Sequence, residues 1–222
     1  MKRTFITIFS KITYMKNLFK LLFAFTITTA TFASCVDDKD IFDPEAQLAL
    51  EKPIIESYVK QNYPNAQQHE NTGIWYETID PGEPDSYDYD IKDTLNQKWV
   101  FAEGIINYKG KLVANGTIFD ETKDISKGDT IPIYMSLNTG QASVITAWIY
   151  AFSPKTLTVD EQTIDLGIIF TNGAQNGSKF RIITPSQYAY GNSVQGKIPA
   201  NSPLDFEVEV LKMRDFDPKR DN

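Results

Sequence analysis

The feature that most constrains this chain is a series of short apolar runs separated by turn residues, which begins at Gly73 and continues to residue 214. Apolar runs with this punctuation are typical of an antiparallel β-sheet. Asn115-Gly116 is the strongest hairpin signal, because both residues tolerate the positive φ that a tight turn requires. We expect strands at residues 74–79, 98–108, 111–114, 131–137, 164–170, 178–183 and 204–212.

Residues 43–72 have helical character and are expected to form an extension ahead of the sheet. Asp43 suits the N-cap of a helix and Pro44 its first position, and apolar residues then follow a period near 3.6 through Asn62. Because proline lacks an N–H, Pro53 predicts the end of a first turn or a kink. The helix is interpreted either as a spacer that packs one face on the domain or as a dimerisation or partner helix.

Residues 1–34 carry basic side chains and no acidic ones. They include the apolar stretch 21–27, then small residues, and lead into Cys35, which is the layout of a secretory signal peptide. The apolar stretch is too short and too rich in threonine for a comfortable membrane span. A start at Met15 would give a tidier leader, so residues 1–14 are interpreted as an extension ahead of the true start.

Cys35 is the only cysteine in the sequence and follows the leader directly. This position resembles the lipobox of bacterial lipoproteins, in which the cysteine is lipidated and becomes the mature N-terminus. The resemblance implies a lipidated tether at residues 35–42, whose acidic segment 36–40 looks like the export signal of Bacteroidetes-type lipoproteins. We therefore expect an exported protein that is lipid-anchored in the cell envelope, at the outer membrane, on its periplasmic or surface face. The alternative is an ordinary signal peptide followed by an incidental cysteine.

Charge and composition exclude several classes of function. The chain has 22 Lys and Arg against 29 Asp and Glu, with net charge −7 and no basic run, so nucleic acid is not an expected partner. One cysteine and one histidine cannot build a zinc site, and the polar surroundings of His69 predict a solvated surface residue. The acidic segment 85–90 lacks the Gly turn and terminal Glu of an EF-hand loop, so it is interpreted as a solvated loop rather than a calcium site. No metal or cofactor is therefore predicted.

Five segments, taken in order, carry a more specific pattern. Residues 108–112 read Tyr-Lys-Gly-Lys-Leu, and residues 116–120 read Gly-Thr-Ile-Phe-Asp. Residues 140–148 contain Gly, Val-Ile and Trp, residues 185–191 read Pro-Ser-Gln-Tyr-Ala-Tyr-Gly, and residues 198–210 begin with Ile-Pro-Ala-Asn. Together these segments resemble the motifs of FKBP-type peptidyl-prolyl cis-trans isomerases. Their order and spacing are more specific than any one of them alone.

The resemblance implies an α+β fold, in which a strongly twisted antiparallel sheet wraps around one short α-helix near residues 143–151. The FKBP-like domain would span residues 73–214 and follow the N-terminal helical extension. The family has a much shorter connection after the helix, so residues 149–176 contain an insertion. Residues 215–222 are interpreted as a tail.

The resemblance also implies a peptidyl-prolyl cis-trans isomerase or a proline-directed folding helper on a membrane-anchored lipoprotein. Rotation about an X-Pro bond must overcome about 18 to 20 kcal/mol, because the amide loses resonance as it twists. Apolar walls favour the less polar twisted amide, and no nucleophile or cofactor is needed. Proline-containing polypeptides are then the expected partners. The alternative is a noncatalytic surface lipoprotein that uses the same aromatic cleft to bind a peptide or partner.

Carried over position by position, the resemblance assigns three catalytic residues. Trp148 forms the floor beneath the proline ring, Tyr190 donates its hydroxyl to a substrate carbonyl, and Asp120 polarises the site or orients a neighbouring side chain. The Ile145 N–H holds a second carbonyl. The substrate-binding residues implied are Tyr108, Phe119, Met135, Val144, Ile145, Ile198 and Phe206.

Three departures from the family pattern bear on activity. Ala147 stands where the family has glycine, and Met135 stands where it has a wall phenylalanine. The insertion at 149–176 could deepen, cover or redirect the pocket. The discriminating observation is whether the three catalytic residues converge on one open cleft or whether the insertion fills it.

Overall fold

The computed structural model describes residues 42–94 and 96–217. The predicted signal peptide 1–34, the start at Met15, the lipidated Cys35 and the end of the predicted tail lie outside the described residues. Within the described part of the chain, no helix has the length and apolar character needed to cross a membrane.

Strand β4 (Gln97–Leu112) organises the main sheet, because other strands pair with both of its edges. The strands follow the order β1-β2-β9-β10-β4-β3. Strands β5 and β6 also pair with β4, on the edge opposite β10. Every pairing is antiparallel. The bounds of these strands are β1 Gln67–His69, β2 Ile74–Asp80, β3 Ile91–Thr94, β5 Ile118–Glu121, β6 Asp129–Ser136, β9 Lys179–Thr184 and β10 Leu204–Arg214.

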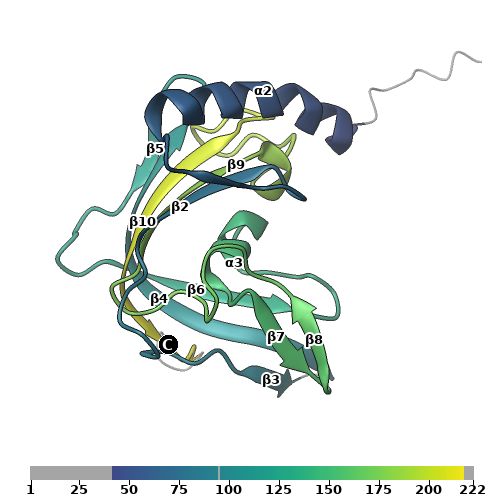
Figure 1. Ribbon diagram of the computed structural model, residues 1–222, viewed down its shortest axis with the longest axis vertical. Helices are drawn as coiled ribbons and strands as arrows, with labels where there is room; N and C mark the ends of the chain where they lie inside the picture. The colour runs from purple at the N-terminus through teal and green to yellow at the C-terminus, as the bar shows by residue number, and fades with distance from the viewer. Residues whose placement is uncertain (1–41, 95, 218–222) are drawn as a thin grey trace, which may run out of the picture. The chain divides into compact units, whose positions relative to one another are not determined.

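Helix α3 (Thr146–Phe152) lies within the concave side of the curved sheet (Figure 1). Phe152 is fully buried, and its ring meets Phe180 of β9 edge-on with 5.3 Å between centroids. A helix of two turns is not stable by propensity alone, so burial of its apolar residues holds it in place. The predicted α+β fold, a twisted antiparallel sheet around one short helix, is confirmed.

Helix α2 (Pro44–Asn62) packs on the opposite face of the sheet, where its buried Ile55 and Val59 contact Ile183 of β9. Its start matches the prediction, because the Asp43 side chain accepts hydrogen bonds from the N–H groups of Glu45 and Ala46. The expectation that Pro53 ends a first turn is wrong. Pro53 lies on the exposed side of a helix whose other side is held by packing.

Two expectations about the extension need correction. It is not helical throughout, because residues 67–69 form β1 and pair with β2. His69 is therefore a half-buried strand residue rather than a solvated loop residue, and its Nδ1 lies 3.0 Å from Thr72 Oγ1.

The strand predictions differ from the structure in several places. Residues 98–108 and 111–112 belong to one strand, β4, while residues 113–114 lie in the turn that follows it. Residues 166–170 were expected in a strand, but they form buried irregular backbone packed against the core. An apolar run of that length does not distinguish a strand from other buried structure. Strands β3, β5 and β7 (Thr156–Val159) were missed because each has only four residues.

The predicted insertion contains a separate two-stranded sheet, formed by β7 (Thr156–Val159) and β8 (Gln162–Asp165). The acidic segment 85–90 is also more ordered than a solvated loop. The Tyr87 hydroxyl donates to the Phe101 carbonyl at 3.2 Å and the Tyr89 hydroxyl donates to the Ala174 carbonyl at 3.1 Å. These tyrosines fasten the segment, while the carboxylates of its aspartates stay exposed.

Candidate active site

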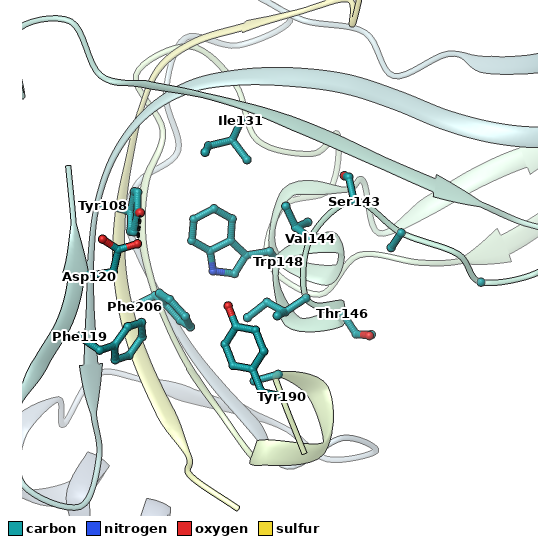
Figure 2. Close-up of a pocket in the computed structure, with 14 residues that line it drawn as sticks. Tyr108, Phe119, Asp120, Ile131, Ser143, Val144, Thr146, Trp148, Tyr190 and Phe206 are labelled. Carbon is teal, nitrogen blue, oxygen red and sulfur yellow. Dashed lines mark hydrogen bonds between the residues drawn. The ribbon is translucent and has the colours of Figure 1, made fainter. Parts of the chain in front are cut away.

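A cavity of about 610 Å³ lies between α3 and the concave face of the sheet. Figure 2 shows its aromatic wall and the polar groups at its rim. The structure brings together eight residues that the sequence analysis assigned to the site, namely Tyr108, Phe119, Asp120, Val144, Ile145, Trp148, Tyr190 and Phe206.

Trp148 forms the base of the cavity and is 6% exposed. The rings of Tyr108 and Phe206 each meet its indole edge-on, with 5.4 Å between centroids. Edge-to-face contacts of this kind stabilise aromatic clusters beyond the area that they bury. The indole is therefore held from two sides and leaves a fixed apolar surface toward the cavity.

The cavity wall depends on a glycine in β4. A Cβ atom at Gly110 would lie 2.5 Å from Phe119 Cζ and 3.0 Å from Phe206 Cε1. Because glycine has no Cβ, the Phe119 and Phe206 rings approach to 5.5 Å between centroids. Gly110 is thus required by the close approach of these two rings.

Asp120 and Tyr108 form a hydrogen-bonded pair across neighbouring strands. Asp120 in β5 pairs with Gly110 in β4, two residues from Tyr108, so both side chains share one face of the sheet. The Tyr108 hydroxyl donates to Asp120 Oδ2 at 2.5 Å. Burial, followed by this hydrogen bond, raises the pKa of Tyr108 above its ordinary value. Asp120 is therefore placed to orient Tyr108, and which of its two implied roles it takes stays a prediction.

Tyr190 reaches the cavity from the loop after the 3-10 helix η1 (Ser186–Tyr188). Its side chain is 37% exposed, and Figure 2 shows its hydroxyl directed into the cavity. Burial, with the negative charge of Asp120, raises the pKa of Tyr190. The hydroxyl therefore stays protonated at neutral pH and can donate a hydrogen bond to a ligand.

The segment before α3 supplies the opposite rim. Ile145 is the N-cap residue of α3 and has an extended ψ of 148°. The segment is fixed to β6, because the Ser143 N–H donates to the Tyr134 carbonyl at 3.0 Å and the Ser143 hydroxyl donates to the Pro132 carbonyl at 2.8 Å. These bonds hold Val144 and Ile145 at the cavity.

Two predicted substrate-binding residues do not line this cavity. Met135 packs at the far part of β6, where it pairs with Val100. Ile198 is 5% exposed and belongs to the hydrophobic core. Ile131 of β6 lines the cavity instead. Ile131 and Met135 are four residues apart on β6, so the alternation of the strand puts both side chains on one face.

Other lining residues were missed by the sequence analysis because small and polar side chains carry no distinctive signal. They are Gly140, Ala142, Ser143, Thr146 and Ala189. The motif segments that contain them were recognised, so extending each motif to its neighbours would have included them.

The insertion does not fill the cavity. No residue from 149 to 176, all of which the structure describes, lines the cavity. The residues of α3 that line it, Thr146 and Trp148, precede this segment. The hairpin β7–β8 lies to one side of α3 (Figure 1). In the part of the chain that the structure describes, no group of three or more His, Cys, Asp or Glu side chains could hold a metal ion.

The curved sheet around one short helix and the aromatic cleft between them define a domain of the FKBP class. Residues 103–211 match the family model of FKBP-type peptidyl-prolyl cis-trans isomerases. The match covers 49% of this chain, and the enzyme class that it supports for the domain is the FKBP-type peptidyl-prolyl cis-trans isomerase.

Curated relatives match the same part of the chain. Over 109 residues, 49% of this chain, the sequence is 34% identical to FK506-binding protein 4 of Saccharomyces cerevisiae and covers 21% of that protein. It is 32% identical over 98 residues, 44% of this chain, to FK506-binding protein 1 of Aspergillus oryzae and covers 64% of it. The chain thus spans about a fifth of the first relative and just under two thirds of the second.

Solved structures are similar at lower identity. The peptidyl-prolyl cis-trans isomerase of Pseudomonas syringae is 22% identical with a TM-score of 0.43, and the match covers 77% of this chain and 96% of that chain. FkpA from Escherichia coli is 23% identical with a TM-score of 0.44, and the match covers 90% of this chain and 73% of that chain.

Proposed function

We propose that this protein catalyses the cis–trans isomerisation of X-Pro bonds in polypeptides. The observation that carries the proposal is the convergence of Asp120, Trp148 and Tyr190 on one cleft that the insertion leaves open. A cavity of about 610 Å³ is large enough for a proline ring and its flanking groups.

The cleft would lower the barrier by favouring a twisted amide over a planar one. Twisting removes the resonance of the amide and makes it less polar, so apolar walls above the Trp148 indole suit the transition state. The Tyr190 hydroxyl would donate to a carbonyl beside the proline, and the Ile145 N–H would hold another. These contacts would fix the chain on both sides of the rotating bond. No proton leaves either donor during the reaction.

The direct test measures the isomerisation rate of a short peptide with a single X-Pro bond, with and without the protein. We expect an acceleration that rises in proportion to protein concentration and is suppressed by a second proline-containing peptide in excess. An unaccelerated rate, together with a change in tryptophan fluorescence on peptide addition, would support the noncatalytic peptide-binding function instead.

We further propose that the protein is exported and anchored in a bacterial cell envelope, at the outer membrane, through acyl chains on Cys35. The support is the basic and apolar leader followed by an isolated cysteine. Each buried methylene contributes about 0.8 kcal/mol, so two or more chains give stable anchoring. Replacing Cys35 by Ser should move the protein from the membrane fraction to the soluble fraction. Equal membrane retention of both forms would contradict the anchor.

The proposed start at Met15 has its own test. Lys16 and Lys20 supply positive charge ahead of the apolar stretch, so residues 1–14 should be dispensable. Expression from Met15 should give the same mature N-terminus as expression from Met1. Processing of the longer form alone would contradict this start.

A further inference from the structure

Glu51 of helix α2 is a buried carboxylate that lies outside the cavity. It is 2% exposed and accepts hydrogen bonds from the Ser186 N–H at 2.7 Å, the Ser186 hydroxyl at 2.5 Å and the Gln47 side-chain amide at 2.8 Å. A carboxylate in so buried a position costs free energy unless donors of this kind compensate its desolvation.

The burial of Glu51 runs against the usual pattern of a packed helix. Its neighbour Leu50 is 66% exposed and Ile54 is 52% exposed, whereas the charged Glu51 faces the domain. A helix selected only for packing would place apolar residues inward and charges outward. Glu51 is therefore better explained by the hydrogen bonds that it makes than by burial of apolar surface.

Ser186, the residue that Glu51 holds, organises the loop that carries Tyr190. The Ser186 carbonyl accepts hydrogen bonds from the Ala189 N–H at 2.9 Å and from the Gly191 N–H at 2.8 Å. Those two residues flank Tyr190 in the sequence. The carboxylate of α2, the Ser186 peptide and the backbone on both sides of Tyr190 thus form one continuous series of hydrogen bonds.

Helix α2 can support this loop because other contacts fix it to the sheet. The Tyr58 and Tyr63 hydroxyls donate to Asp205 Oδ2 at 2.7 and 3.0 Å. Ile55 and Val59 add apolar contacts with the same face. The position of the Glu51 carboxylate is therefore set by the sheet, and the carboxylate in turn sets the position of Ser186.

We propose that Glu51 is a positioning residue for Tyr190, acting from outside the cleft through Ser186. This inference deepens the proposed function, since it rests on Tyr190 donating a hydrogen bond to the substrate. It also gives the N-terminal helix a role in the site, in addition to covering one face of the sheet.

The test uses the full chain with Glu51→Ala, the conservative variant Glu51→Gln, and Tyr58→Phe as a control that loosens α2 at a different contact. The first readout is hydrogen exchange at the Ala189 and Gly191 amides. We expect about tenfold faster exchange in Glu51→Ala and a smaller change in Glu51→Gln. Tyr58→Phe should change loop exchange little, because the Tyr63 hydroxyl still donates to Asp205. Glu51→Gln keeps a carbonyl oxygen for the Ser186 N–H, so it also serves if Glu51→Ala fails to fold.

The second readout is kcat/KM for the X-Pro peptide, with and without Tyr190→Phe. If Glu51 acts through Tyr190, Glu51→Ala should lower kcat/KM about tenfold alone but less than about twofold in the Tyr190→Phe background. Equal losses in both backgrounds, or loop exchange no faster than in Tyr58→Phe, would overturn the inference. A wild type without isomerase activity would refute the proposed function, and the exchange data would then decide the positioning role alone.

Discussion

The concave face of strands β9 and β10 is apolar, whereas the opposite face of the same two strands carries buried charge. Phe180, Ile182 and Phe206 point toward α3 and the cleft. Arg181 and Asp205 alternate with them and point toward α2. Because successive side chains of a strand point to opposite faces of the sheet, the same few residues supply both the apolar face and the charged face. The apolar face shapes a cleft, and the charged face orients a helix.

The charged face relies on directional contacts. Arg181 Nη1 donates to the two carboxylate oxygens of Asp205 at 2.8 and 3.1 Å. The guanidinium also lies 4.0 Å from the centroid of the Tyr63 ring, which is a cation–π contact. A second carboxylate, that of Glu207, pairs with Arg181. Each contact in this network has a required geometry, so the network allows fewer positions of α2 on the sheet than apolar packing alone would.

The largest effect is expected on the apolar face. Trp148→Ala removes the base of the cavity and should reduce the free energy of unfolding by about 3 to 5 kcal/mol, and turnover should fall to the uncatalysed rate. Phe152→Ala is the matched control, because Phe152 is buried on the same helix but does not line the cavity. Thermal unfolding measures the loss of stability in both variants, and turnover at equal folded fraction shows whether only Trp148→Ala loses catalysis. If Trp148→Ala retains turnover, the indole contributes only to the hydrophobic core and not to catalysis.

On the charged face, Asp205→Asn should lower stability more than it lowers turnover per folded molecule, because the Glu51–Ser186 hydrogen bonds beside Tyr190 remain. The variant weakens hydrogen bonds to a charged group, which are worth about 1.5 to 3 kcal/mol. Glu207→Gln is the control, because the Glu207 side chain is 55% exposed and an exposed ion pair contributes little. Denaturant unfolding and a peptide assay check both variants. A loss of turnover per folded molecule as large as that expected for Glu51→Ala would contradict this expectation.

A smaller effect is expected from Asp120→Leu, which removes the acceptor of the Tyr108 hydroxyl. Loss of one hydrogen bond at an exposed carboxylate should cost about 1 kcal/mol of transition-state stabilisation, or roughly fivefold in turnover, with little change in the thermal midpoint. Tyr108→Phe deletes the other partner, and its effect should not add to that of Asp120→Leu. If the losses of turnover in the two variants add fully, Asp120 and Tyr108 act independently and this account of their pairing is contradicted.

The smallest effect is expected from pH. Burial raises the pKa values of Tyr108 and Tyr190, so turnover should not change through tyrosine ionisation between about pH 7 and 9. Burial also raises the pKa of Tyr58 on the charged face. A raised pKa gives stability that is complete below about pH 10, the ordinary value, and is lost as the pH rises through the folded value. Denaturant unfolding from pH 8 to 11 should show the start of that loss above about pH 10, reduced in Tyr58→Phe.

The cleft was largely predictable from the sequence, because its residues lie in short motifs with fixed order. Trp148, Asp120 and Tyr190 were placed at the cavity from such motifs. Met135 was also taken from the family pattern, but it pairs with Val100 of β4 and does not line the cavity. The fold was predictable for a similar reason, since alternating strands and an Asn-Gly turn are local signals.

The charged face was not predicted. Arg181 and Asp205 are 24 residues apart, and Glu51 and Ser186 are 135 residues apart. Within their own segments these residues look like ordinary polar positions on strands, a helix and a turn. Only the pairing of β9 with β10 and the docking of α2 bring them together, so their burial is a property of the tertiary structure.

The most direct measurement of the central claim is the turnover of wild type and Tyr190→Phe on one X-Pro peptide at equal folded fraction. The Tyr190 ring stays in place and only the hydroxyl directed into the cavity is lost, so stability should change by no more than about 0.5 kcal/mol. Wild type should accelerate isomerisation, and Tyr190→Phe should be about tenfold slower. A wild-type rate equal to that in buffer would contradict the isomerase function, and equal turnover of both forms would contradict the role of Tyr190.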